Sequence, residues 1–126
     1  MKKLSVILVV LVFLTFANVS LTQASIESAQ TISSVVLIQA YFSETEGVSG
    51  SGFFISSDGF ILTNSHVVIN EETKEPSSEI YICTVEDEYS QPVCKYMAAV
   101  VSYDTTLDLA LLVIAGEINE SGELVQ

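Results

Sequence analysis

The sequence predicts an all-β fold, either a barrel or a sandwich. Short runs rich in β-branched and aromatic residues recur at even intervals along the chain. Residues that favour turns, mainly glycine, proline, asparagine, aspartate and serine, separate these runs. After the N-terminal segment, no stretch of useful length carries apolar residues at the spacing of an amphipathic helix. Short strands that alternate with turn signals in this way are typical of all-β sandwiches and barrels.

The N-terminal segment is typical of a secretory signal. Residues 1–3 are a short basic start, and an uncharged, mostly apolar run covers residues 4–21. Ala24 is a small residue suited to cleavage, and Ala17 is an alternative site. We therefore predict a signal peptide over residues 1–24 and an exported protein, without stable membrane insertion once the signal is cleaved. An uncleaved anchor is the alternative, although the apolar part is short for a membrane-spanning helix.

The first strands follow a polar lead-in. Residues 25–33 are polar and are predicted to be exposed, and the folded domain is predicted to cover residues 34–126. The run VVLIQAYF at 35–42 has the composition of a buried strand, and the glycine-rich segment after it is predicted to break that strand. Two apolar runs, 53–56 and 60–65, flank an Asp-Gly turn, which is a strong hairpin signal.

Three further strands are predicted after an exposed loop. Residues 70–79 are acidic, contain proline and carry no apolar side chain, so they are predicted to be a solvated loop. The runs IYICTV, VCKYMAAVVSY and LDLALLVIA then have strand composition. Together with the earlier runs they complete a domain built from strands.

The charge balance excludes one class of partner. The chain has 16 acidic residues and 4 basic ones, all lysines, for a net charge of −12. Because almost nothing is available to neutralise phosphates, we expect no nucleic-acid binding. Adsorption to anionic membranes is disfavoured for the same reason. Solubility is the plain interpretation of the acidic excess, and neither a metal nor a cofactor is predicted.

The two cysteines, Cys83 and Cys94, fit an exported protein in an oxidising compartment. They lie on either side of a polar segment, so two antiparallel strands could bring them face to face. We predict a structural disulfide between them, with two unpaired thiols as the alternative. A zinc site built from both cysteines and His66 would lack a short ligand pair.

His66 and Asp108 are the candidate catalytic residues. Each is the only ionisable side chain within an apolar, strand-like stretch. An isolated buried carboxylate is costly without a partner, so the two are natural partners for each other. An imidazole held by a carboxylate has a fixed tautomer and acts as an oriented general base. On composition alone, the favoured interpretation is that each is structural, the histidine in the core and the aspartate at a turn.

Two segments resemble trypsin-like serine proteases of the Deg/HtrA type. GSGFFISSDGFILTNSHVV, residues 50–68, resembles the segment with the catalytic histidine, and AAVVSYDTTLDLALLVI, residues 98–114, resembles the one with the aspartate. The resemblance implies that His66 is the general base and acid and that Asp108 orients it. It also implies the N-terminal six-stranded barrel of a chymotrypsin-like double β-barrel. Leu107 departs from the family, which usually has threonine or a similar polar residue there.

The nucleophile of this family lies in a Gly-(Asn/Asp)-Ser-Gly-Gly context within the second barrel. No such motif follows Asp108 in this sequence. Ser49 and Ser51 lie upstream of the histidine, and the glycines around them fit close approach of backbones in a crowded barrel. We therefore predict that the nucleophilic serine and the second barrel are absent from this chain, and that the chain alone is inactive.

The sequence thus predicts the N-terminal part of a secreted serine endopeptidase that acts on polypeptides. The alternative is a non-catalytic, one-barrel binding or scaffold protein derived from a protease. In either case a single barrel would expose the face that its partner should cover. An exposed apolar face of that kind favours self-association.

Overall fold

The computed structural model describes residues 33–87, 89–119 and 121–125. The predicted signal peptide and all but the last residue of the predicted lead-in lie outside the described residues. The elements are β1 (Val35–Tyr41), β2 (Gly47–Phe54), β3 (Phe60–Thr63), α3 (Ser65–Val68), β4 (Glu79–Thr84), β5 (Val93–Asp104), β6 (Leu109–Ile118) and β7 (Leu124–Val125). The described part contains no helix long and apolar enough to cross a membrane.

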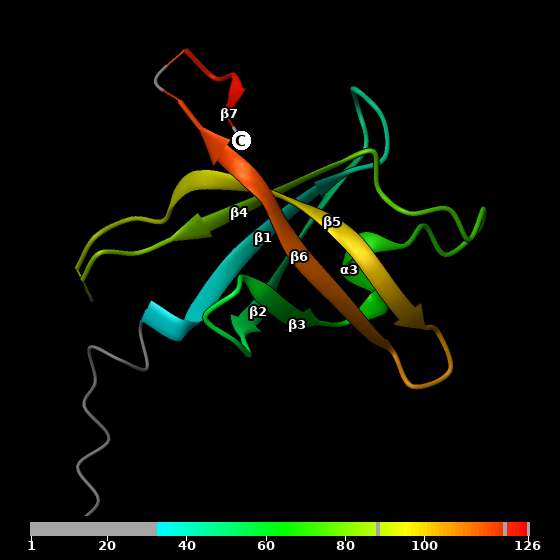
Figure 1. Cartoon of the computed structure of the whole chain (residues 1–126). Coiled ribbons are helices and arrows are strands. Elements are labelled where there is room, and N and C mark those ends of the chain that lie inside the picture. The colour runs from blue at the N-terminus through cyan, green and yellow to red at the C-terminus, as the bar shows by residue number, and fades with distance from the viewer. Residues whose placement is uncertain (1–32, 88, 120, 126) are drawn as a thin grey trace, which may run out of the picture.

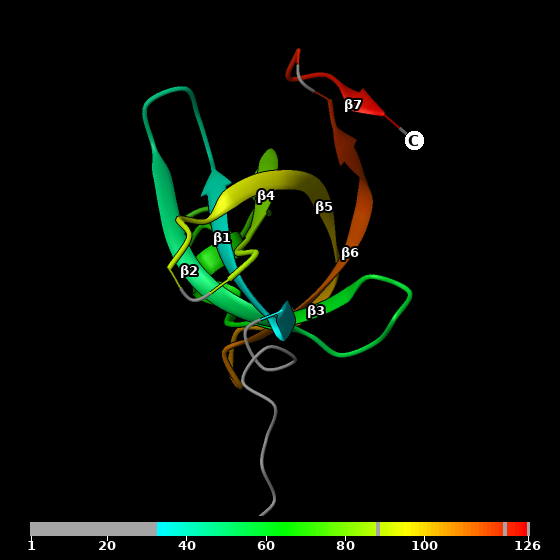
Figure 2. The ribbon, with the colours of Figure 1, turned by 90° about the vertical axis from the view of Figure 1, so that its left-hand side faces the viewer.

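The strands form one antiparallel sheet in the order β3-β2-β1-β4-β5-β6-β7. An additional pairing of β3 with β6 closes the six strands from β1 to β6 into a barrel. The short strand β7 pairs with the end of β6. Figure 2 shows the strands wrapped around a common axis, and Figure 1 shows the long strands β5 and β6 crossing the front of the barrel. The prediction of an all-β barrel is therefore confirmed.

The core fills the barrel with aliphatic side chains that alternate along the strands. In β1, Val36, Ile38 and Ala40 are buried, while their neighbours face outward. The other walls of the core come from β3, β4, β6 and the segment after β3, namely Ile61, Ile80, Ile82, Ala110, Leu112, Val67, Val68 and Ile69. Each valine, leucine or isoleucine among them contributes about 1.5–3 kcal/mol when it is fully buried. This core anchors α3, because its two valines are part of it.

The glycine-rich segment breaks the first strand at residues 42–46, as predicted, but from Gly47 onward it is itself a strand, which the sequence did not indicate. β2 begins at Gly47 and pairs with β1 from Gly47 to Phe53. A Cβ atom built on Gly50 would lie 2.4 Å from Cγ2 of Val67, and one on Gly52 would lie 2.8 Å from Cδ1 of Ile38. The glycines are therefore needed where β2 passes against α3 and the core. Close approach of the backbone was the interpretation favoured for them from the sequence.

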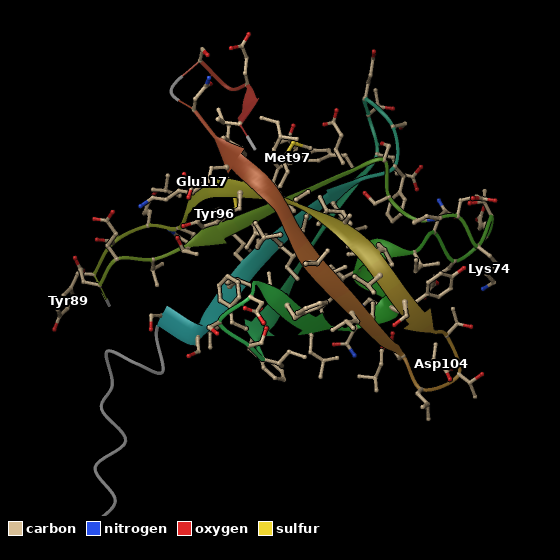
Figure 3. All side chains as sticks on the ribbon, viewed as in Figure 1. Lys74, Tyr89, Tyr96, Met97, Asp104 and Glu117 are labelled. Atoms are coloured by element: carbon tan, nitrogen blue, oxygen red, sulfur yellow. A yellow bond between two sulfur atoms is a disulfide. The ribbon has the colours of Figure 1, made fainter. Side chains whose placement is uncertain are left out.

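The hairpin at Asp58-Gly59 is present, and Gly59 has a φ of +83°, a conformation that suits glycine. The loop after α3 is short of apolar contacts and mostly exposed, as predicted. An isolated antiparallel β-bridge between Ile69 and Pro76 joins two parts of this loop region. Figure 3 shows Lys74, in this loop, on the opposite side of the molecule from Tyr89 in the β4–β5 loop.

Cys83 and Cys94 are joined by a disulfide, the pairing that the sequence predicted. They are register partners on β4 and β5, where the register shifts between Ile82 and Cys83. The bridge therefore fastens the start of the β4–β5 connection. It also removes both sulfur atoms from any zinc site with His66.

Candidate active site

The segment that carries His66 is a change of direction at the end of β3. β3 ends at Thr63, Asn64 is still extended with φ −78° and ψ 144°, and α3 begins at Ser65. The hydroxyl of Thr63 donates to the carbonyl of Ser51 at 2.8 Å, which ties the end of β3 to β2. Within α3, Ser65 and the two valines are buried. The only outward-facing residue of this turn of helix is the histidine.

The segment that carries Asp108 is the turn between β5 and β6. The carboxylate of Asp104 accepts the backbone N–H groups of Thr106 and Leu107, at 2.8 and 3.0 Å, and so shapes the turn. Asp108 itself has a φ of +52°, in the left-handed region that non-glycine residues rarely occupy. β6 starts at the next residue. Because β6 pairs with β3, the turn places Asp108 beside the segment that follows β3.

His66 and Asp108 are in direct contact. Nδ1 of the imidazole lies 2.8 Å from Oδ2 and 3.0 Å from Oδ1 of the carboxylate. An ionised carboxylate only accepts hydrogen bonds, so Nδ1 carries the proton and Nε2 is left with a free lone pair. The histidine side chain is 51% exposed and the aspartate 42% exposed. The pair therefore lies at the surface of the barrel, with a base that a reacting group can reach.

Asp108 has three further donors, all from the segment after β3. The backbone N–H of His66 donates to Oδ1 at 3.1 Å, and the hydroxyl of Ser65 donates to the same oxygen at 3.0 Å. The side-chain amide of Asn64 donates to Oδ2 and to the main-chain carbonyl of Asp108, both at 3.0 Å. Asn64 and Ser65 were not identified from the sequence as site residues. Both lie inside the TNSH run, immediately before the histidine.

These donors explain the acidity of the aspartate. The backbone N–H of His66 is the largest influence, followed among the donors by the His66 side chain and the Ser65 hydroxyl, and together they lower the pKa of Asp108 to about 2. Partial desolvation acts in the opposite direction and is outweighed. The carboxylate is therefore ionised throughout the neutral range, which keeps it an acceptor for Nδ1–H.

His66 and Asp108 line one cavity, and a second depression of different character lies nearby. The cavity, of about 430 Å³, is lined by Ser65, His66, Ile69, Glu71, Lys74, Thr105 and Asp108. A smaller apolar groove of about 220 Å³ includes Asn64 in its lining, together with Val35, Ser51, Gly52, Phe53, Leu62, Thr63 and Leu109. Three of its apolar side chains are well exposed, with Val35 at 49%, Phe53 at 48% and Leu109 at 41%.

The remaining sequence candidates lie elsewhere. Ser49 and Ser51 are on β2, opposite Gln39 and Leu37 of β1, and within the described residues neither hydroxyl is hydrogen-bonded to His66. A larger cavity of about 650 Å³ lies over the outer faces of β1 and β4 and shares no residue with the His66 cavity. Among the residues that the structure describes, no group of three or more His, Cys, Asp or Glu could hold a metal ion.

The sequence has counterparts in known proteins. The family described as "Trypsin-like peptidase domain" matches residues 50–125. A probable periplasmic serine endoprotease, DegP-like, from Chlamydia pneumoniae is 38% identical over 72 residues, which cover 57% of this chain and 12% of that protein. Serine protease HTRA4 from Mus musculus is 38% identical over 71 residues, covering 56% of this chain and 12% of its own length.

A solved structure is similar as well. The active form of the Rv3671c protease from M. tuberculosis superposes with a TM-score of 0.53 at 31% sequence identity. The match covers 70% of this chain and 33% of that one. The chain thus spans only about an eighth of the curated relatives and a third of this structural neighbour.

Proposed function

The chain belongs to the trypsin-like peptidase family, in its Deg/HtrA type, and we propose that its His66–Asp108 pair is the base and orienting acid of a Ser-His-Asp triad. Members of this family are serine endopeptidases, so the proposed reaction is hydrolysis of peptide bonds in polypeptide substrates. The observation that carries the proposal is the contact of Nδ1 with both carboxylate oxygens, at 2.8 and 3.0 Å. Because this contact places the proton on Nδ1, Nε2 is the nitrogen that can act as the base.

The proposed mechanism follows from that tautomer. Nε2 of His66 takes the proton from a serine hydroxyl as its oxygen attacks the peptide carbonyl carbon, and Asp108 stabilises the imidazolium that forms. The imidazolium then gives this proton to the leaving amine, the C–N bond breaks, and an acyl-enzyme remains. Water, deprotonated by the same nitrogen, then attacks the ester carbonyl. The C–O bond breaks, and the imidazolium returns the proton to the serine oxygen, which restores the serine and the neutral base. Asp108 keeps its charge throughout and serves to orient and stabilise.

We propose that the serine and the oxyanion donors belong to a second barrel, outside the 126 residues of this sequence. The apolar groove beside Asn64 supports this arrangement, because an exposed apolar patch next to polar groups is typical of an interface. Seated there, a second barrel would cover Val35, Phe53 and Leu109 and come within reach of His66. The domain boundaries proposed are a signal peptide at 1–24, a lead-in at 25–33 and this barrel at 34–126.

We also propose export. The apolar N-terminal run supports a cleaved signal, and the disulfide fits an oxidising compartment. The relative from Chlamydia pneumoniae is named as periplasmic. A test is to follow the chain fused to a reporter through the export pathway of its host. Retention of the fusion at full length in the cytoplasm would contradict this part of the proposal.

The catalytic proposal is tested on the complete protein, with the reading frame continued past the codon for residue 126. Against a casein substrate, Asp108→Asn should lower kcat by about 10⁴-fold, because the carboxylate no longer enforces the tautomer. His66→Ala should leave little activity. Asp58→Asn, which alters an exposed carboxylate in the β2–β3 turn, is the matched control and should retain full activity.

Two results would contradict the proposal. One is a complete protein whose His66→Ala variant is folded and as active as the unaltered protein. The other is peptidase activity of the 126-residue chain alone, lost on His66→Ala, which would place the nucleophile within these residues. A stop codon directly after Gln126 would favour the non-catalytic one-barrel alternative.

A further inference from the structure

We infer that Asn64 and Ser65 are positioning residues which, with the backbone N–H of His66, hold Asp108 so that the base–acid pair is assembled within this one barrel. We call these three donors the carboxylate clamp. The inference deepens the proposed function and rests on it for its catalytic meaning. Its structural content is that the orientation of His66 requires no donor from a second barrel.

Ser65 is the buried part of the clamp. Ser65 is only 3% exposed, and its hydroxyl donates to Oδ1 of Asp108 at 3.0 Å. It is the first residue of α3, whose position is fixed by the burial of Val67 and Val68 in the core. A hydroxyl held in this way cannot follow the carboxylate if the latter rotates. Hydrogen bonds to charged groups are also stronger than those between neutral groups.

Asn64 is the part of the clamp that acts on the backbone. Its amide nitrogen lies 3.0 Å from both the main-chain oxygen and Oδ2 of Asp108. One amide thereby fixes the backbone and the side chain of the same residue. This matters because Asp108 has a φ of +52°, which is unfavourable for a residue with a Cβ atom. The two donor hydrogens of an amide suit both contacts, and no carboxylate or aliphatic side chain could make them.

The clamp accounts for both oxygens of the carboxylate. Oδ1 accepts from the Ser65 hydroxyl and the His66 backbone, Oδ2 accepts from Asn64, and both face Nδ1 of His66. All of these donors come from three consecutive residues. The other charged groups that line the adjoining cavity are Glu71 and Lys74, and no ion pair joins either of them to Asp108 among the described residues. The low pKa of Asp108 agrees with the donors from His66 and Ser65.

The test uses NMR on the full 126-residue chain, labelled with ¹⁵N at histidine. At about pH 9, where an imidazole is neutral, the ring of His66 should show a protonated Nδ1 and an unprotonated Nε2. In Asn64→Ala and Ser65→Ala, this preference should shift towards the tautomer mixture of an unrestrained imidazole. The carboxyl ¹³C signal of Asp108 should titrate about one pH unit higher in the double variant.

Thr63→Val is the matched control. It removes a hydroxyl that is about as buried as that of Ser65 but donates to the carbonyl of Ser51 rather than to Asp108. The His66 tautomer and the Asp108 titration should therefore not change. Ser65→Thr keeps the hydroxyl and should restore both signals. Because Asn64 is exposed, Asn64→Ala should fold even if Ser65→Ala does not.

The inference is overturned if the unaltered chain shows the unrestrained tautomer mixture, or if folded Asn64→Ala leaves both signals unchanged. This outcome is separate from the fate of the proposed function. If the complete protein shows the predicted His66 tautomer and Asp108 titration but has no peptidase activity, the catalytic proposal alone is refuted. An active protein whose tautomer forms only when the second barrel is present would refute the clamp alone.

Discussion

Substitution of Gly50 by alanine tests the packing of α3 on β2. At a glycine without a positive φ, this change usually stabilises a protein by about 0.4–1 kcal/mol, because it restricts the unfolded chain. Here the new Cβ atom would lie 2.4 Å from Cγ2 and 2.8 Å from Cγ1 of Val67. Val67 is 3% exposed and belongs to the core, so it cannot turn aside. The contact should reverse the sign of the effect.

The magnitude follows from the usual cost of overpacking, about 1–3 kcal/mol. For a domain of this size, a loss of about 2 kcal/mol corresponds to a fall in Tm of roughly 8–16 °C. Val67→Ala alone should also destabilise, because it leaves a cavity. The double variant should lose less free energy of unfolding than the sum of the single variants, since the missing methyl groups of Val67 make room for the new Cβ.

The assay is urea unfolding of the four proteins in a double-mutant cycle, which isolates the coupling between the two positions. We expect a coupling of at least about 1 kcal/mol in the favourable direction. Additive losses within about 0.5 kcal/mol would refute the reasoning, as would a Gly50→Ala variant that is more stable than the unaltered chain. Either result would mean that β2 does not press against α3 in solution.

Three further predictions concern pH, the disulfide and the apolar groove. Because folding lowers the pKa of Asp108 from 3.8 to about 2, its contribution to stability is present above about pH 4 and is lost as the pH falls towards 2. In acid unfolding followed by circular dichroism, Asp108→Asn should remove this part of the pH dependence, and an unchanged profile would contradict it. Reduction of the Cys83–Cys94 bridge should lower the free energy of unfolding by about 2–3 kcal/mol, measured in urea with and without reductant; an unchanged midpoint would show that the bridge does not constrain the chain. If the apolar groove drives self-association of the isolated chain, Phe53→Ser should lower the apparent mass in sedimentation, whereas Tyr89→Ser, at an exposed residue that does not line the groove, should not.

Much of the fold could be predicted because its signals are local. A β-branched run such as 35–42 needs no partner to indicate a strand, and the Asp58-Gly59 pair specifies its own turn. The two cysteines could be paired because the segment between them is short and polar. The pairing of His66 with Asp108 could be anticipated from the resemblance of their two segments to the Deg/HtrA type. Their isolation as lone ionisable groups within apolar stretches fitted that pairing but also fitted two separate structural roles. In these cases the sequence near the residue contains the physical reason for its structure.

Other features depend on distant residues and could not be predicted. α3 has four residues, too few to show a helical period. β2 begins in a run of glycines and serines that looks like a loop, because its glycines are required by Val67 rather than by a turn. Asn64 and Ser65 acquire their roles only from Asp108, 44 and 43 positions further along. No pattern around either residue indicates that contact.

The seam between β3 and β6 has a consequence for how the molecule folds. Its pairs, from Phe60 with Val113 to Thr63 with Ala110, join residues further apart in sequence than those of any other strand pairing in the described part. Contacts across long loops are costly to form early and tend to form late in folding. His66 lies three residues after the end of β3, and Asp108 is the residue immediately before β6. In a chain whose barrel is still open, His66 therefore has no contact with Asp108 to orient it. That contact forms only when β3 pairs with β6.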